Sequence, residues 1–360
     1  MLLRPLQSVT GIVERRHTLP ILSNVMMESH GGNFSFTATD LEIQVLAQAE
    51  ASGQENDFAI TVSAKKFQDI LRALPDGTKI SLDWKENRLQ VKAGKSRFQL
   101  QTLPAEDFPK LSPLEDANSS IKIPQKLFKH LLNQVQYAMA QQDIRYYLNG
   151  MLLVIGDNEI KVIATDGHRL SFASAKLDQS ELPSQEVILP RKTVVELMRL
   201  LSDSDDEIEL VIGKNQVKFS FSNITVNSKI VDGKFPDFNR VIPTGYSNHF
   251  TIDRLTLLQA MQRAAILSNE KFRGVRLVLT NGSLKVICTN TEQEEAEEEL
   301  EIDYAGQPLD IGFNVTYLVD VLNNIDNSQV VCSFGDATSS GLLTIPGNDQ
   351  FKYVVMPMRI

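Results

Sequence analysis

The sequence has few cysteines and no long hydrophobic run. Its two cysteines, Cys288 and Cys332, lie within apolar, strand-like stretches, which indicates buried free thiols rather than a disulfide or a metal site. No run of the 18 or more apolar residues that a membrane helix requires occurs, and residues 1–5 pass directly into a polar helix pattern. We therefore expect no membrane partner, no signal peptide and a cytoplasmic location.

The sequence also lacks the motifs of common cofactor and catalytic sites. It contains no Gly-x-x-x-x-Gly-Lys-Ser/Thr loop, and no Gly-x-Gly-x-x-Gly follows a strand-like run. The five histidines show no spacing typical of metal ligands. We therefore expect no cofactor, no metal and no catalytic residues, which argues against an enzyme.

The formal net charge of −9 argues at first against nucleic acid, because DNA-binding domains are usually basic. However, seven glutamates fall within residues 292–301, and the rest of the chain is close to neutral. This block is either a solvated acidic face or an interface. A basic stretch with Lys92, Lys95 and Arg97 beside Phe98 complements it. The two stretches together predict head-to-tail association, which closes a ring if the rotation permits.

A threefold internal repeat is the clearest pattern in the sequence. Residues 36–40 (Phe-Thr-Ala-Thr-Asp) return as 162–166 and again as 286–290, at spacings of 126 and 124 residues. Strand-like runs beginning at Asn24, Gly150 and Gly274 repeat at the same intervals, and so do helix-like segments at 62–71, 189–198 and 313–322. Three landmarks in register indicate one structural unit copied three times.

Each repeat consists in turn of two β-rich half-units with one helix apiece. Amphipathic helices follow short strand-like runs and begin near residues 62, 123, 189, 252 and 311. A half-unit cannot bury its apolar faces alone, whereas two halves sharing a core make a domain of ordinary size. The sequence thus predicts an α+β protein of three tandem domains, with boundaries at 1–116, 117–243 and 244–360.

The polar positions of these helices are mostly basic. They hold Lys65, Lys66, Arg72, Lys126, Lys129, His130, Arg191, Lys192, Arg199, Arg254 and Arg263, with Asp69, Glu196 and Asp253 as exceptions. A single basic helix is usually just a soluble face. The same bias in helices from three repeats predicts a surface that meets phosphates without reading base sequence.

The segment 165–170 (Thr-Asp-Gly-His-Arg-Leu) looks catalytic at first sight. Its repeat partners begin with Thr39-Asp40 and Thr289-Asn290, so the Thr-Asp pair is expected to be a turn with Asx hydrogen bonding in all three repeats. Only the Gly-His-Arg part is particular to the second repeat.

Several long motifs carry a resemblance to a known family. They are Thr-Leu-Pro-Ile-Leu at 18–22, Arg-Tyr-Tyr-Leu-Asn-Gly at 145–150, Ala-Thr-Asp-Gly-His-Arg-Leu at 164–170, Phe-Pro-Asp at 235–237, the segment 265–274 and the terminal 353–359. Over essentially its full length the chain resembles the bacterial DNA polymerase III β subunits, the replication sliding clamps. The resemblance implies three DNA-clamp domains and a head-to-tail dimer ring, with helices lining the hole and sheets forming the outer wall.

The family resemblance also implies a function. Such a clamp is non-catalytic, encircles double-stranded DNA without sequence preference, and acts as a processivity factor. Its implied partners are a second copy of the chain, the replicative polymerase, an ATP-driven clamp loader, translesion polymerases and mismatch-repair proteins, bound through short linear peptides.

The family's DNA-contacting positions fall on Arg16, Lys65, Gln142, Tyr146 and Tyr147. The two tyrosines suit stacking on a single-stranded template, although Tyr147 can also be read as a core aromatic. Lys65 stands where arginine is common, which keeps the charge but loses bidentate phosphate geometry.

The family's peptide pocket and dimer contact each correspond to a larger group of residues in this chain than the DNA contacts do. The pocket falls on Leu148, Thr165, Gly167, His168, Arg169, Leu170, Pro236, Arg240, Val241, Asn314, Tyr317, Thr338, Ser340, Val354, Val355, Met356, Pro357, Met358 and Arg359. Leu170 and Val354 can alternatively be plain core residues. The dimer contact falls on Lys66, Lys95, Arg97 and Phe98 of one chain and on Ile266, Leu267, Glu294 and Glu298 of the other.

The chain departs from its own repeat at the N-terminus. Strand-like runs near 119–123 and 249–252 precede the first helix of the second and third repeats, but no such run precedes the first helix of the first repeat. We therefore expect one sheet to be short of a strand and to expose an edge. Ile360 and Thr338 are milder departures from the family pattern.

Two other classes of protein remain as alternatives. A catalytic repeat protein would depend on residues 166–169, so that changing His168 would abolish turnover. An interaction scaffold without a DNA role would explain the repeats but not the basic helices. Clamps of the proliferating-cell type share the ring but have two domains per chain, so three repeats favour the bacterial form.

Overall fold

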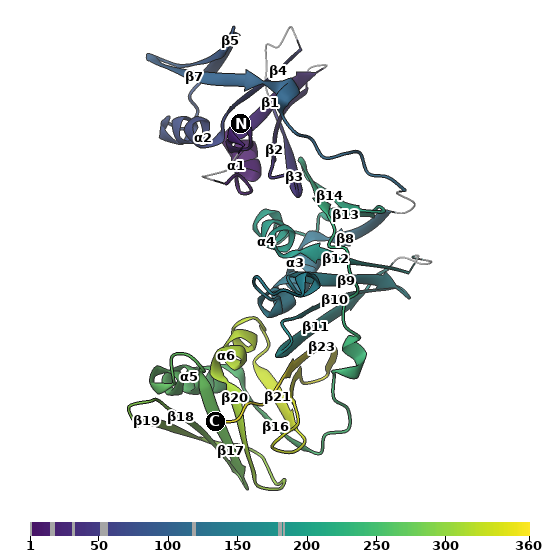
Figure 1. The fold of residues 1–360 in the computed structure, drawn as a ribbon, viewed down its shortest axis with the longest axis vertical. Coiled ribbons are helices and arrows are strands. Elements are labelled where there is room, and N and C mark those ends of the chain that lie inside the picture. Colours follow the sequence, from purple (N-terminus) through teal and green to yellow (C-terminus); the bar gives the residue numbers. More distant parts are fainter. Residues whose placement is uncertain are drawn as a thin grey trace. The chain divides into compact units, whose positions relative to one another are not determined.

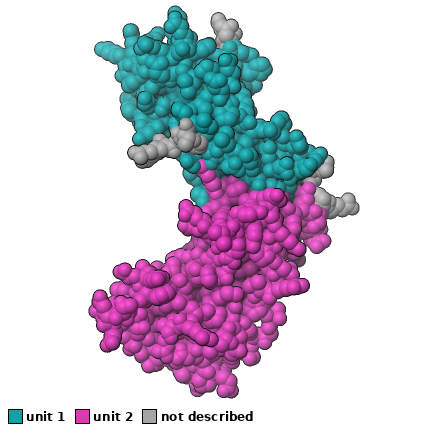
Figure 2. Space-filling model, in the orientation of Figure 1, with its two compact units in different colours: residues 1–128, 195–230 teal, residues 129–194, 231–360 magenta. Residues whose placement is uncertain are grey.

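The computed structural model describes residues 2–14, 19–30, 33–50, 57–116, 120–178, 182 and 184–360. The chain divides into two compact units, one formed by residues 1–128 and 195–230 and the other by residues 129–194 and 231–360 (Figure 2). We call them unit 1 and unit 2. Among the described residues, no helix is long and apolar enough to cross a membrane.

Unit 1 is built on one 11-stranded sheet (Figure 1). Its strand order is β5 (Ile80–Lys85), β6 (Arg88–Ala93), β7 (Ser96–Pro104), β4 (Phe58–Ser63), β1 (Asn24–His30), β2 (Asn33–Thr39), β3 (Ile43–Ala49), β15 (Ile224–Lys229), β14 (Gln216–Phe221), β13 (Glu207–Ile212) and β8 (Ser120–Pro124). All neighbouring strands are antiparallel.

Unit 2 contains an 8-stranded and a 4-stranded sheet (Figure 1). The first has the order β12 (Gln185–Pro190), β9 (Gly150–Gly156), β10 (Glu159–Thr165), β11 (Arg169–Lys176), β23 (Asn348–Val355), β22 (Gly341–Ile345), β21 (Gln329–Phe334) and β16 (Asn248–Asp253). The second has the order β19 (Glu295–Glu301), β18 (Ser283–Thr289), β17 (Gly274–Thr280) and β20 (Leu309–Asn314).

The helices confirm the sixfold pattern that the sequence predicts. They are α1 (Leu3–Thr10), α2 (Ala64–Ala73), α3 (Gln125–Val135), α4 (Arg191–Leu200), α5 (Arg254–Ala264) and α6 (Val315–Asn323), and the last five begin two to four residues after the expected positions. Short 3-10 turns are η1 (Pro20–Ser23), η2 (Ala105–Asp107), η3 (Gln136–Ala138), η4 (Tyr146–Leu148), η5 (Phe238–Arg240) and η6 (Ala265–Leu267). The predicted α+β class with three repeats is confirmed.

Apolar residues at helical and strand spacing form the cores. In α2 the buried residues are Ala64, Phe67 and Leu71, which lie on one face of the helix. The ring of Phe67 lies 6.2 Å from that of Phe36 in β2, so α2 is anchored to its sheet by aromatic packing. In strand β13 buried and partly exposed residues alternate, as expected for a sheet with one covered face.

Strand pairing joins neighbouring repeats into continuous sheets. In unit 1 β3 of the first repeat pairs with β15, the last strand of the second repeat. In unit 2 β11 of the second repeat pairs with β23, the last strand of the third. The division into two units follows these joints rather than the repeats, so the domain boundaries predicted from the sequence stay predictions.

Candidate functional site

The Thr-Asp segments form the predicted turns in all three repeats. The side chain of Asp40 accepts hydrogen bonds from the backbone N–H groups of Glu42 and Ile43, at 2.9 and 2.8 Å. Asp166 accepts from His168 and Arg169 at 2.9 and 3.1 Å.

In the third repeat Asn290 accepts from Glu292 and Glu294 at 2.9 and 3.0 Å. The structural interpretation of this motif is therefore confirmed. Gly167 has φ = +90° in its turn, Leu41 has φ = +78° and Gln293 has φ = +64°, so the backbone enters the left-handed region in all three turns.

Arg169 is the residue that turns the second-repeat segment into a site. Its guanidinium donates to Asp320 Oδ2 at 2.6 Å, to Asp166 Oδ2 at 3.1 Å and to the carbonyl of Tyr137 at 2.7 Å. It also lies 4.3 Å from the centre of the Tyr317 ring. Because the side chain is only 9% exposed, these contacts fix the start of β11 against α6 and η3.

The electrostatic environment keeps this arginine charged. Burial acts to lower the pKa of Arg169, but Tyr353, Asp320 and Asp166 raise it above its ordinary value. Burial raises the pKa of the Tyr137 and Tyr353 hydroxyls, which therefore stay neutral and act as hydrogen-bond donors or acceptors. Tyr353 donates to the carbonyl of Tyr317 at 2.9 Å. The arrangement suits anchoring rather than proton transfer.

An apolar cluster lies next to this anchor. Leu170 and Val354 are paired residues of β11 and β23 and are 2% and 1% exposed. The cluster is completed by the buried Leu152, Ile163, Phe172, Ile188 and Phe235, against which pack the partly buried Tyr147, Val154, Val231, Phe238, Ile242 and Leu342. Since six of its thirteen members are only partly buried, the cluster reaches the surface of unit 2.

The C-terminal segment runs along this region and beyond it. The backbone N–H of Met356 donates to the carbonyl of His168 at 2.8 Å, and that of Met358 donates to Gly312 at 2.8 Å. The side chain of Met356 is 46% exposed. Met358 and Arg359 line a hollow together with Asn269, Phe272, Gly274, residues 289–291 and Ile360.

The other predicted pocket residues lie on turns of unit 2. Leu148 is buried in η4, Arg240 and Val241 are exposed at η5, and Pro236 is exposed just before it. Asn314 caps α6 by accepting from the N–H of Thr316 at 2.9 Å. Thr338 and Ser340 lie in the turn before β22. The Thr338 N–H donates a hydrogen bond to the Asp336 carboxylate, and the Tyr246 hydroxyl donates one to the carbonyl of Ser340.

The predicted DNA-contacting residues are distributed over both units. Arg16 lies outside the described residues. Lys65 is exposed on α2 in unit 1. In unit 2 Gln142 is exposed, and Tyr146 is 58% exposed with its ring 6.0 Å from that of Tyr147. Tyr147 is half-buried and packs against the apolar cluster, which supports the reading of this residue as partly a core aromatic.

A loop anchored by Asp143 carries the two tyrosines. Arg145 donates to both oxygens of Asp143, at 3.0 and 2.9 Å, and the Asn149 amide donates to the Asp143 carbonyl at 2.9 Å. Hydrogen bonds from Arg145 lower the pKa of Asp143 to about 2. The loop is therefore organised by its own ion pair.

Several helical arginines have structural partners that the basic pattern did not indicate. Arg199 donates to the carbonyls of Gln7 and Ser8 at the end of α1 and pairs with Glu196. Arg254 donates to the carbonyl of Leu322 near the end of α6, at 2.8 Å. These contacts argue against a phosphate-facing role for Arg199 and Arg254. Lys65 and Lys66 on α2 are exposed and remain compatible with such a role.

Most residues of the predicted dimer contact lie in or beside strands β19 and β7. Strand β19 is an edge strand, and its Glu298 pairs with Arg263 of α5 through two hydrogen bonds of 2.8 and 2.6 Å. Glu294 accepts from the Asn290 amide. Next to β19 lies η6, in which Ile266 is 77% exposed and Leu267 is half-buried.

On the other side of the predicted contact, Arg97 is exposed and Phe98 is half-buried in β7, with Lys95 exposed in the turn before it. Residues 96–101 of β7 pair with β6 on one side, whereas β4 pairs only with residues 102–104.

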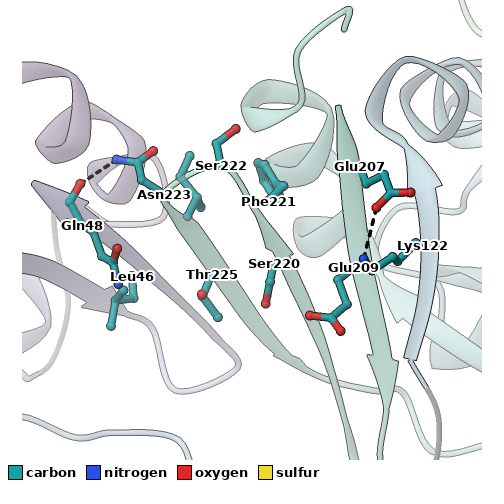
Figure 3. A pocket seen from close by; sticks show the side chains of 11 residues that line it. Leu46, Gln48, Lys122, Glu207, Glu209, Ser220, Phe221, Ser222, Asn223 and Thr225 are labelled. Carbon is teal, nitrogen blue, oxygen red and sulfur yellow. Dashed lines mark hydrogen bonds and ion pairs between the residues drawn. The ribbon is translucent and has the colours of Figure 1, made fainter. Parts of the chain in front are cut away.

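A further hollow lies on the outward face of the unit 1 sheet (Figure 3). It is lined by Leu46, Gln48, Lys122, Glu207, Glu209 and residues 220–225, and the Lys122 amine lies 3.3 Å from a Glu207 oxygen. None of the predicted site residues lines it. The Lys122 and Glu207 charges pair with each other across neighbouring strands, which favours a structural role.

The cysteines match their prediction, since both are free and buried. Burial raises the pKa of Cys288 to about 11 and that of Cys332 to about 12. Within the part of the chain that the structure describes, no group of three or more His, Cys, Asp or Glu side chains is placed to hold a metal ion.

Sequence reasoning missed the residues that support the site. Asp320 and Tyr137 hold Arg169, but Asp320 is 151 residues away from it, and no local pattern indicates that pair. Phe172 and Phe238, whose rings lie 6.0 Å apart, also went unnoticed. The Phe-Pro-Asp motif at 235–237 was the available signal for this aromatic group.

Comparison with known proteins gives consistent matches over the whole chain. Family models described as the N-terminal, central and C-terminal domains of the DNA polymerase III beta subunit match residues 1–112, 122–237 and 239–359. Proteins named beta sliding clamp from Pseudomonas putida and Escherichia coli strain K12 are 46% and 45% identical to the chain, covering 100% of it and 98% of each relative.

Solved structures agree with the sequence matches. A crystal structure of the DNA polymerase III subunit beta from Pseudomonas aeruginosa has a TM-score of 0.97 and 46% identity and covers 100% of this chain and 98% of its own. The pol III beta of Caulobacter crescentus has a TM-score of 0.94 and 37% identity, with the same coverage.

Proposed function

Because this chain belongs to the DNA polymerase III beta subunit family, we propose that it is a DNA sliding clamp: a non-catalytic processivity factor that encircles duplex DNA and tethers the replicative polymerase in the cytoplasm. The observation that carries this proposal is that all three domains of the family match in order along the chain. A topological link keeps the polymerase at a high effective concentration near its primer without tight contacts.

Strand pairing supports a head-to-tail dimer. The joints β3–β15 and β11–β23 each pair the last strand of a repeat's first half with the last strand of the next repeat. In this pattern β19 and β7 are the remaining two members. Among the described strands, β19 has a neighbour on one side only, and β4 pairs with β7 only through residues 102–104. We infer that β19 of one chain pairs with β7 of another, so that two chains close a ring.

The dimer contact should be stabilised mainly by apolar burial. Exposed ion pairs contribute only about 0–1 kcal/mol each, and Glu298 is already satisfied by Arg263 within its own chain. Ile266, 77% exposed in the single chain, together with Phe98 and Leu267, supplies the apolar area that association would cover.

The DNA contacts of the clamp should be weak and insensitive to sequence. The exposed Lys65 supports a phosphate contact, and the exposed Tyr146 ring supports stacking on a single-stranded template. Gln142 and Arg16 are proposed as further contacts. Weak contacts suit the function, because tight or base-specific contacts would stall a sliding ring.

The peptide site is proposed at the apolar cluster of unit 2. Its partly buried rim, with the exposed Met356 and Val241 nearby, suits the leucine and phenylalanine anchors of short extended peptides. Met356 and Met358 make such a surface adaptable to several clients. The proposed clients are the replicative polymerase, the clamp loader, translesion polymerases and mismatch-repair proteins.

The decisive experiment tests topological retention on DNA. The chain is loaded onto nicked circular DNA with a matching clamp loader, and the DNA is then linearised. We expect a particle of about twice 40.3 kDa by light scattering that stays on circles and leaves linear ends. A monomer, or retention that ignores DNA ends, would contradict the ring.

Two single substitutions test the surfaces separately. Ile266→Lys should convert the dimer to monomers. Met356→Lys should lower the affinity for a fluorescent client peptide at least about tenfold without changing the dimer. Thr280→Lys, at an exposed position at the end of β17, is the matched control for both. If Ile266→Lys leaves the same dimer as Thr280→Lys, the proposed dimer surface is refuted. If Met356→Lys binds the peptide as tightly as Thr280→Lys, the proposed peptide site is refuted.

A further inference from the structure

Lys352 is a cation at the border of the apolar cluster of unit 2. It lies on β23 opposite Phe172 of β11, and the cluster residue Val354 follows it by two positions on the same strand. Residues opposite one another in an antiparallel pair point to the same face, and so do residues two apart on one strand. Lys352, Phe172 and Val354 therefore share one face of the sheet.

The charged end of Lys352 lies over an aromatic ring. Its Nζ atom is 5.6 Å from the centre of the Phe172 ring, which is within the range of a cation–π contact. Phe172 is 8% exposed, whereas Lys352 is half-buried. This position suits a lysine whose alkyl stem packs on the apolar cluster while its ammonium group reaches the rim.

The charge of Lys352 has no acidic partner in the described part of the chain, unlike that of other lysines on the strands of unit 2. Lys161 on β10 pairs with Glu159 at 3.1 Å. Lys285 on β18 pairs with Glu297 at 2.7 Å. Among the described residues, no carboxylate lies within ion-pair distance of the Lys352 amine. A ligand at the rim can therefore pair with this ammonium group without displacing an internal partner.

The equivalent joint in unit 1, between β3 and β15, has neither the cation nor the apolar surface. At the place of Lys352 it has Thr225. At the places of the paired Leu170 and Val354 it has two polar side chains that end in amides. Strand pairing at such a joint therefore does not require a lysine, and of the two joints only that in unit 2 combines a cation with an apolar surface.

We propose that Lys352 is a specificity-determining residue of the peptide site, which selects client peptides that carry an aspartate or glutamate beside their apolar anchors. The inference rests on the proposed peptide site and adds the charge of its ligands. The ammonium group has free donors for a charge-assisted hydrogen bond to a carboxylate. Since Lys352 and Val354 are roughly 7 Å apart along β23, the carboxylate would lie about two residues from the anchor that contacts Val354.

The test compares aspartate with asparagine in one extended peptide. The probe is fluorescein-labelled Ser-Ser-Ser-Leu-Phe-Ser-Ser-Ser, whose Leu-Phe pair supplies the apolar anchors. Each serine in turn is replaced by aspartate or by asparagine, and binding to the full chain is measured by fluorescence polarisation. At one position or more, aspartate should bind at least about threefold more tightly than asparagine, as a partly exposed ion pair allows. This preference should shrink as the salt concentration rises.

Three variants assign the preference to Lys352. Lys352→Met keeps an apolar stem on Phe172 and removes the charge, so the ratio of the two affinities should fall to near one. Lys352→Arg should retain the preference, because guanidinium also pairs with carboxylate. Lys176→Met removes an exposed charge at the far end of β11 and should retain it as well. A merely structural role of Lys352 would change the affinities of both peptides equally.

Two results would overturn the proposal. One is a ratio near one at every position in the unmodified chain, and the other is a preference for aspartate that survives in Lys352→Met. If peptides bind without any preference, the peptide site stands and only the role of Lys352 is refuted. If no peptide of either set binds, the peptide site itself is contradicted, and this inference with it.

Discussion

Replacing Arg169 with methionine should destabilise unit 2 by about 3 kcal/mol. The change removes a guanidinium that is 9% exposed and leaves Asp320, Asp166 and the Tyr137 carbonyl without their shared donor. Breaking a buried ion pair costs about 3–5 kcal/mol. We expect the lower end of this range, because the Asp320 side chain is 31% exposed and water can partly replace the arginine.

The assay is urea denaturation followed by two signals. Far-UV circular dichroism reports on both units, whereas Trp84 fluorescence reports on unit 1, where β5 lies. The Arg169→Met variant should lose stability in the first signal and keep the wild-type midpoint in the second. Arg276→Met, which breaks the exposed pair with Asp310 in unit 2, should cost less than about 1 kcal/mol.

A double-mutant cycle identifies the interaction. Arg169→Met and Asp320→Asn should show a coupling energy of about 1–3 kcal/mol, as residues in direct contact do. A coupling energy near zero, or a loss for Arg169→Met no larger than that for Arg276→Met, would refute the anchoring role of this arginine.

Three further predictions follow from the same structure. Because Arg145 holds the pKa of Asp143 at about 2, the 143–149 loop should keep its ion pair above pH 3.8 and lose it as the pH falls through 2, which an NMR titration of the carboxyl group checks. Burial raises the pKa of Cys288 and Cys332, so at about pH 8 a thiol reagent should find two reactive thiols only after unfolding; reaction of the native chain would contradict this. Lys65→Ala should reduce the slope of log K for DNA against log salt by about one per chain, and an unchanged slope would exclude a phosphate contact there.

The sequence predicted the repeating elements well. Five helices begin two to four residues from their expected positions, and the Asx turns at Asp40, Asp166 and Asn290 form as expected. Both features depend on residues close in the chain, namely the helical spacing of apolar residues and a side chain that reaches the backbone two to four residues ahead. The position of β5 at the end of the described sheet was also expected from the repeat pattern.

The supporting contacts of the site were not predictable from pattern alone. Arg199 and Arg254 look like solvent-facing cations in their helices, yet they donate to backbone carbonyls at helix ends that are distant in sequence. Leu170 and Val354 each fit both a core and a peptide pocket, and only their places in one cluster with a partly buried rim support both roles. Hydrophobicity alone does not say which apolar residues reach the surface.

The sequence by itself determined the repeats of this protein: their number, their helices, their turns and the family to which they belong. Only the tertiary structure decided how the repeats are joined, through β3 with β15 and β11 with β23, and that β5 and β19 end their sheets among the described strands. The physical reason is the range of the interactions. Helices and turns are stabilised within a few residues, whereas the pairing of two strands more than a hundred residues apart depends on the cores that bring their edges together.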